Sequence, residues 1–190
     1  MPSCAMMGSD GMNIANLTKY SKTAIALHWL IAILIITNVV LVSMAEGLPR
    51  DAKAVYMTPH KAIGISILLF SLLRLFWRIG HKPPPIPGAV PAWQAKLGRT
   101  VHAFFYFLII AVPLTGWLMV SAFPGSSGVD YFGIVNLDLP VGDSKSLSEI
   151  AKLGHEILTK PLVILIFLHV LGALKHQFID RVPFIQRMFP

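Results

Sequence analysis

Residues 155–169 read HEILTKPLVILIFLH, an almost wholly apolar stretch with a histidine at each end. In an α-helix this spacing is nearly four turns, so His155 and His169 lie on one face, about 21 Å apart along the axis. Ionisable side chains are costly inside a bilayer and are candidates for function when they occur there. A zinc site would need ligands one helical turn apart, which this stretch lacks. The spacing instead suits two planar cofactors, one near each membrane surface.

The rest of the chain predicts an all-α integral membrane four-helix bundle. The sequence is 55% hydrophobic and 13% charged, whereas soluble domains carry about 25% charged residues. Each apolar run is close to the ~20 residues that cross a bilayer; the runs are 23–44, 59–79, 101–123 and 155–178. Pro113 and Pro161 fall inside two of them, as membrane helices tolerate. One domain over 19–190 is expected.

The segments outside these runs also carry predictions. Residues 1–18 are poor in apolar side chains and are expected to be a disordered tail, with Met12 as a second candidate start. The run 23–44 exceeds the 7–15 residues of a signal-peptide core, which favours a membrane helix over a cleaved leader. The proline-rich loop 80–98 should be extended and stiff. The loop 124–145 is long enough to cap the bundle.

The net charge of +7 is interpreted as a membrane feature and not as a nucleic-acid-binding surface. Lysines and arginines gather at the ends of the apolar runs, where they set membrane orientation. With the N-terminus inside, nine of them lie on the cytoplasmic side and six outside. This count favours cytoplasmic N- and C-termini.

Cysteine chemistry is excluded as the basis of a cofactor site. Cys4 is the single cysteine, so there is no thiolate zinc site and no cysteine-bound iron–sulfur cluster. No Cys-x-x-Cys-His motif occurs, so a haem would not be covalently attached.

The depth of each histidine in the membrane predicts which histidines lie opposite each other. His28 lies near the cytoplasmic end of its run, as does His169, while His60 and His155 open their runs from the outside. The pairs His28–His169 and His60–His155 predict two bis-histidine haem irons without an open position, which pass electrons and do not bind oxygen at iron. For any one histidine, a hydrogen-bonded interior group is the competing interpretation, and the repeated pattern argues against it.

Two residues near these histidines are candidate haem contacts. Arg74 is 14 residues after His60 and so shares its face; it suits a haem propionate, although snorkelling to the surface explains it equally well. Gly64 is one turn from His60 and leaves room for a macrocycle or for a neighbouring helix.

Three histidines are left over. His176 is seven residues after His169, and we expect it to contact a quinone or a propionate; as an axial ligand it would place the haems about 31 Å apart, at the limit of the bilayer. His102, near the inner end of the third run, has the same two candidate roles. His81 lies in a loop and is expected to be solvated.

Several motifs together resemble the bacterial cytochrome b561 family, which is related to the b subunits of nickel-iron hydrogenase and formate dehydrogenase. The opening 20–30, YSKTAIALHWL, has His28-Trp29 in the first helix, and 59–64, PHKAIG, has the family's His-x-x-x-Gly. Residues 74–78, RLFWR, followed by two prolines, resemble its Arg-Leu-x-Trp-Arg signature. His155-Glu156 and His169 match the last helix. The eukaryotic branch of the same name has six helices and fits worse.

The resemblance implies two haem b groups and electron exchange with ubiquinone or menaquinone. The paired histidines match the family's ligand positions, in agreement with their depth. Some members oxidise superoxide outside and pass the electron to ubiquinone. Three cations on that side are candidates for steering a small anion, although ordinary loop charge is the favoured explanation; they are Lys61, Arg50 and Lys53.

The favoured function is a quinone-linked oxidoreductase, of the superoxide:ubiquinone type or with another small periplasmic donor. The alternative is an electron-transfer subunit docked to a periplasmic dehydrogenase. Short outside loops offer little docking area and favour the first. A transporter or a structural bundle without haem is disfavoured, because no inverted repeat is evident.

Overall fold

The computed structural model describes residues 19–81, 83–85, 90–182 and 184–189, so the predicted tail 1–18 lies outside the described residues. Its helices are long and apolar enough to cross a membrane. They are α1 (Lys22–Ala45), α2 (Arg50–Gly80), α3 (Ala92–Ser121) and α4 (Lys145–Leu174). The predicted all-α membrane bundle is confirmed.

Three of the helices begin earlier than the apolar runs predicted. α2 begins at Arg50 rather than near 59, α3 at Ala92 rather than 101, and α4 at Lys145 rather than 155. Hydropathy marks only the part of a helix that suits lipid, while these polar first turns extend beyond it. His60 and His155 therefore lie inside their helices and do not open them. The prediction of an extended loop over 80–98 was wrong for its last residues, which are helical.

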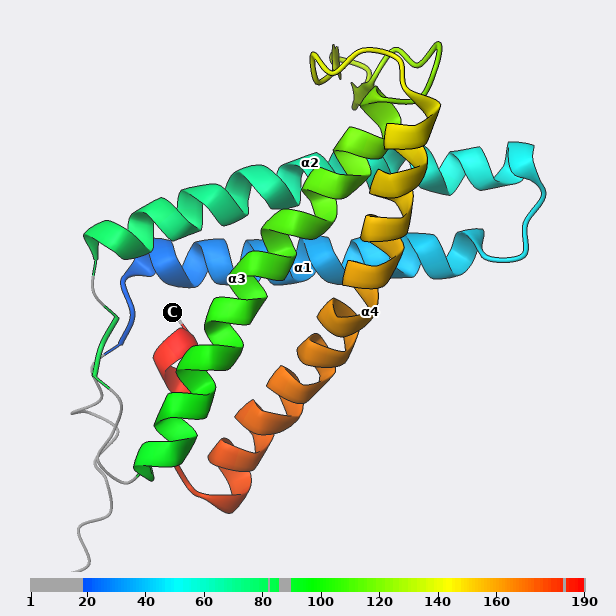
Figure 1. Cartoon of the computed structure of the whole chain (residues 1–190). Coiled ribbons are helices and arrows are strands. Elements are labelled where there is room, and N and C mark those ends of the chain that lie inside the picture. Colours follow the sequence, from blue (N-terminus) through cyan, green and yellow to red (C-terminus); the bar gives the residue numbers. More distant parts are fainter. Residues whose placement is uncertain (1–18, 82, 86–89, 183, 190) are drawn as a thin grey trace, which may run out of the picture.

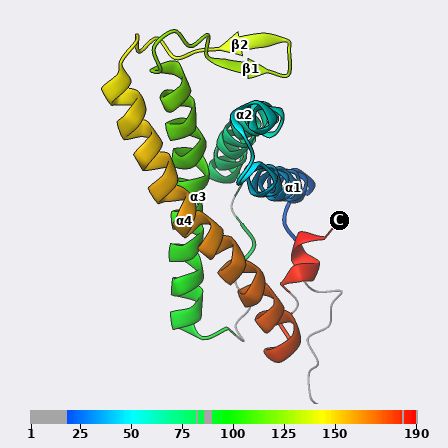
Figure 2. The ribbon, with the colours of Figure 1, turned by 90° about the vertical axis from the view of Figure 1, so that its right-hand side faces the viewer.

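The four helices form two antiparallel pairs that cross at a large angle (Figure 1). α1 packs along α2 and α3 along α4, and the pairs meet chiefly where α3 packs against α2. α4 lies apart from α1 and α2, as the view along the α1–α2 pair shows (Figure 2).

Apolar side chains are distributed as in a protein that is solvated by lipid. The buried core cluster is small, with Leu108, Ile109 and Val112 of α3 against Leu162 of α4. Many large apolar side chains instead face outward along the helices, for example Ile36, Phe76 and Phe167. A large apolar exterior of this kind is incompatible with water and expected in a bilayer.

A β-hairpin covers one end of the bundle, as the position of the predicted capping loop suggested, although its strands were not predicted. β1 (Val129–Tyr131) and β2 (Val135–Leu137) pair antiparallel and project from the α3–α4 pair over α2 (Figure 2). The Tyr131 hydroxyl lies 3.1 Å from Ser66 Oγ of α2, and Trp117 Nε1 donates to the Leu137 carbonyl at 3.1 Å. We call this end the outer end.

The opposite, inner end is closed by the segment after α4. A π-helix (Lys175–Ile179) continues α4, and a short 3₁₀-helix (Ile185–Met188) turns back towards α1 (Figure 2). Tyr20 N donates to the Arg187 carbonyl at 3.3 Å, and Trp29 Nε1 donates to the Met188 carbonyl at 2.7 Å. The Arg187 side chain is buried and donates to the Pro85 carbonyl at 2.9 Å. This segment thus ties together the start of α1 and the loop after α2.

Candidate functional site

The outer end brings His60 of α2 and His155 of α4 together. Their ring centres are 6.3 Å apart, with an interplanar angle of 89°. His155 Nδ1 lies 2.8 Å from the Val112 carbonyl, which fixes Nδ1–H as the donor and leaves Nε2 free. Metal-binding histidines are commonly oriented by such a bond to a backbone carbonyl.

Gly116 of α3 makes room for the His155 ring. A Cβ added at Gly116 would lie 3.0 Å from two atoms of that ring, so a larger residue would displace it. On the other side of the pair, His60 Nδ1 is buried and has no hydrogen-bond partner among the described residues. Residues of α3 therefore fix the orientation of the His155 ring.

A mainly apolar cavity surrounds this pair and reaches all four helices. Its empty space, open mouth included, is about 1050 Å³. Gly64 and Lys61 of α2 line it, as do Val129 of β1 and Thr159 of α4. The hairpin forms part of its wall, since Val129 is fully buried.

The inner end brings His28 of α1 and His169 of α4 together, again with ring centres 6.3 Å apart and with an interplanar angle of 69°. Phe105 of α3 contacts the His169 ring edge to face at 5.4 Å. Trp29, which contacts His28, is anchored by the Met188 carbonyl. Both predicted pairs therefore meet, and both are made across the space between α4 and the α1–α2 pair.

The surroundings of the inner pair are cationic. The Arg74 guanidinium of α2 interacts electrostatically with His28 and His169. It lies 5.9 Å from the centre of the Tyr106 ring, and Arg78 lies 5.6 Å from the same ring. Arg74 is therefore close enough to both inner histidines to act on them electrostatically.

The two pairs fit a haem iron. Two imidazoles on opposite sides of one metal, each bonded at about 2 Å, have ring centres roughly 6 Å apart. Among the described residues, no three side chains of histidine, cysteine, aspartate or glutamate gather into a site for a bare metal ion. Paired ligands, the glycines beside them and the apolar outer cavity suit a flat macrocycle that supplies the remaining ligands itself.

The predicted residue His102 lies beside the inner pair, with its ring centre 5.7 Å from that of His169. The residue is exposed. His81 is exposed, as predicted, and its ring stacks on Trp77 at 3.9 Å.

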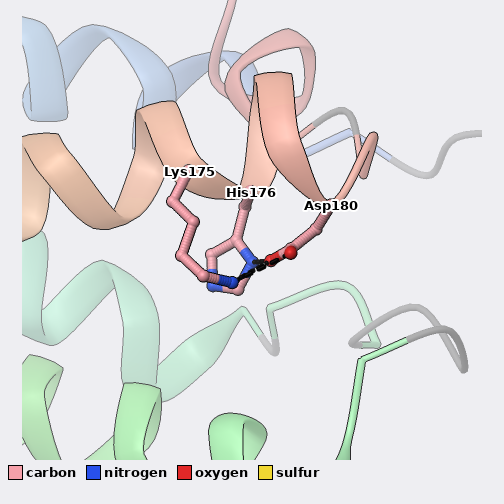
Figure 3. A network of polar contacts seen from close by, with 3 residues as sticks. All are labelled: Lys175, His176 and Asp180. Atoms are coloured by element: carbon pink, nitrogen blue, oxygen red, sulfur yellow. Dashed lines mark hydrogen bonds and ion pairs between the residues drawn. The ribbon is translucent and has the colours of Figure 1, made fainter.

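His176 forms a polar network at the inner end (Figure 3). Its Nδ1 lies 2.7 Å from Asp180 Oδ2, and Lys175 Nζ donates to the same carboxylate at 2.6 Å. The bond from Lys175 holds the pKa of the Asp180 carboxyl below its usual value, with a smaller contribution from His176. The network places an ionised carboxylate beside an imidazole at the bundle surface.

The predicted steering cations occupy the outer end. Lys61 lines the outer cavity beside His60, whereas Arg50 and Lys53 lie in the exposed first turn of α2. Lys61 is therefore the member of the three that reaches the candidate site.

Several residues of these sites were not predicted from the sequence. The Val112 carbonyl carries no side-chain signal, and Gly116 was one glycine among 14. The nearby Pro113 marks an irregular place in α3 and is the signal that pointed there. Asn38, a polar residue within the first apolar run, was a second available signal.

Comparison with known proteins agrees with this geometry. The family model of prokaryotic cytochrome b561 matches residues 19–190. Cytochrome b561 homolog 2 of Escherichia coli (strain K12) is 28% identical over 177 residues, which is 90% of each chain. "Probable superoxide oxidase CybB" of Yersinia pestis is 28% identical over 174 residues, covering 90% of this chain and 96% of that protein. Cytochrome b561 homolog 1 of Escherichia coli (strain K12) is 26% identical over 176 residues, covering 92% and 98%.

The family match covers nearly the whole described chain. The four membrane-crossing helices and the paired histidines agree with it. The chain belongs to the prokaryotic cytochrome b561 family of bacterial membrane electron-transfer proteins, which bind haem b.

Proposed function

We propose that this protein carries two haem b groups and moves electrons from a small donor outside the membrane to the quinone pool. One observation carries the proposal: two histidine pairs with the same 6.3 Å separation lie at two levels of α4. His60 and His155 would hold the outer haem, and His28 and His169 the inner one. Each bound haem would supply reversible one-electron chemistry.

The chain's own residues orient and protect these groups. The Val112 carbonyl fixes the His155 ring, and Gly64 and Gly116 leave space for a macrocycle. Arg74 would pair with a propionate of the inner haem, because a mid-helix guanidinium needs an anionic partner. With two histidines to hold each group, the bound haems would supply electron transfer and would not bind oxygen.

Superoxide is the donor that we favour. A relative named "Probable superoxide oxidase CybB" supports it, and Lys61 adds a cation to the lining of the outer cavity. Two superoxide anions would each release one electron and leave as oxygen, while one quinone takes up two electrons and two protons. Arg50 and Lys53 would add to the attraction for the anion.

The quinone, ubiquinone or menaquinone, would be reduced at the inner end. His176, held by Asp180, and His102, beside His169, are the candidate contacts there. The cation count favours a cytoplasmic position for both termini, and hence for this end, in the inner membrane. Protons would then come from the cytoplasm.

A second function, electron transfer from a docked periplasmic dehydrogenase, is favoured by one surface feature. The tip of the hairpin exposes Phe132 and Ile134, the latter 80% exposed. Apolar side chains at a loop tip suit either lipid or a protein partner. Reduction of the purified protein by superoxide alone, without a partner, separates the two functions.

The first experiment is haem quantitation by pyridine haemochrome on the purified protein and on two variants. We expect two haems b per chain in the wild type, and one each in His155→Ala and His169→Ala, with different residual spectra because a different site survives. His81→Ala, outside both sites, is the matched control and should keep both. One haem in the wild type, or none, would overturn the proposal.

A further inference from the structure

A basic recess lies at the inner end of the bundle, beyond the inner histidine pair. We define it by six of its lining residues: Lys19, Arg74, Trp77, Arg78, His81 and Tyr106. Its empty space, open mouth included, is about 590 Å³. The haem proposal uses only Arg74 of these residues, which leaves the rest of the recess without a function.

The recess concentrates positive charge. Arg74 and Arg78 are one turn apart on α2, and both guanidinium groups lie within 6 Å of the Tyr106 ring centre. No acidic side chain lines the recess in the part of the chain that the structure describes. Asp180, the acid at this end, is already engaged by Lys175 and His176. Like charges this close repel each other, so an anion between them would stabilise the arrangement.

The recess also has arginine donors and a flat aromatic wall. Arginine forks bind phosphate oxygens in pairs. The Trp77 ring, stacked on His81, gives a flat wall, and Pro83 and Pro84 extend it. Trp77 Nε1 donates to Ser21 Oγ at 3.0 Å, which holds the indole in place. Such mixed aromatic and basic surroundings at the end of membrane helices are typical of headgroup level.

We propose that the basic recess binds a phosphate group, with Arg78 as its principal charge. Arg74 interacts with His28 and His169, whereas Arg78 lies one turn nearer the bundle end. The two arginines thus serve different anions, a haem propionate and a phosphate. The phosphate belongs either to a membrane phospholipid or to a free anion. This inference does not depend on electron transfer.

Native mass spectrometry of the purified haem-loaded protein tests the lipid source. Phosphatidylglycerol and phosphatidylcholine are added in equal amounts, and we expect preferential retention of phosphatidylglycerol. Arg78→Gln should weaken that retention about tenfold, because a charged hydrogen-bond partner is lost. Arg78→Lys keeps the charge without the fork and should lie between. Arg181→Gln, at the same end but outside the recess, is the matched control and should bind as the wild type does.

Thermal unfolding tests the free-anion source. Inorganic phosphate should raise the midpoint above that in sodium chloride of equal ionic strength if a free anion fills the recess. Lipid retention without this rise assigns the site to a phospholipid, and the rise without selective retention assigns it to a free anion. Haem content is measured for every variant.

Three results would overturn the proposal. One is that Arg78→Gln and Arg181→Gln both retain lipid as the wild type does, while phosphate has no effect on the unfolding midpoint. Another is an equal loss in both variants, which indicates nonspecific surface charge. The third is loss of haem from Arg78→Gln in proportion to loss of lipid, which would make Arg78 a propionate partner.

Discussion

The outer and inner halves of this bundle contain the same pair of imidazoles in different surroundings. The outer pair lies in an apolar cavity under a hairpin, with the Val112 carbonyl and Gly116 fixing one ring. The inner pair lies beside Arg74, with a third histidine at 5.7 Å. The spacing of the two imidazoles is thus repeated, whereas their surroundings are not. α4 therefore sets where the two pairs lie, and α1, α2 and α3 determine how they differ.

The largest expected effect tests which residue completes the inner pair. His28→Ala should reduce haem content from two per chain to one, because His169 would lose its partner. His102→Ala should keep both haems, although His102 is closer to His169 than His28 is. Pyridine haemochrome and the reduced spectrum measure both. Loss of a haem from His102→Ala, with retention in His28→Ala, would reverse this assignment.

A smaller effect should be confined to the outer half. In Gly116→Ala, the new Cβ would meet the His155 ring at 3.0 Å and shift it away from the Val112 carbonyl. Loss of such an orienting contact typically costs about 10- to 100-fold in metal-site affinity. We expect weakened outer haem binding and an unchanged inner haem.

Gly154→Ala is the matched control for that substitution. Gly154 lies on α4 next to His155, but its added Cβ would meet only Thr115 Cγ2, at an ordinary 3.7 Å. Equal loss of haem from both variants would show that the close approach between position 116 and the His155 ring does not affect haem binding.

The charge difference between the halves predicts a difference in reduction potential. Removing the positive charge in Arg74→Gln should lower the inner potential by on the order of tens of millivolts, because a nearby cation favours the reduced haem. Arg78→Gln should change it less, since Arg78 is not among the charges that act on His28 and His169. Spectroelectrochemical titration reports both sites. A shift of the outer potential alone would contradict the placement of Arg74.

The smallest effect concerns the network of Asp180. Its pKa is lowered in the folded protein, so its contribution to stability is present above the usual carboxyl value, about pH 4, and is lost as the pH falls below it. Asp180→Asn should therefore lower the unfolding midpoint slightly at neutral pH and leave it unchanged in acid. The effect is small because the pair is partly exposed. A midpoint difference that grows on acidification would refute this account.

The sequence predicted four membrane helices and both histidine pairs, because side-chain spacing along α4 is a direct property of the helix. Helix starts were missed where polar turns such as Arg50–Pro59 continue beyond the lipid-like region. The orienting Val112 carbonyl was missed for a different reason. Backbone groups carry no sequence signal, and the meeting of α3 with His155 depends on how two helices pack. The basic recess likewise combines α2, α3 and the start of α1, which no local pattern reveals.

The place of α4 in the chain has a consequence for biosynthesis. Both histidine pairs include a residue of α4, which is made after the other three membrane helices. His169 follows His28 by 141 positions (169 − 28), a delay of roughly 7 to 28 seconds at ordinary rates of translation. During that time His28 is in the membrane without its partner, and His60 is without His155 for a shorter interval. On the proposed ligand assignment, haem insertion at either level would be a late event in assembly, and a pause in translation before α4 would delay both haems together.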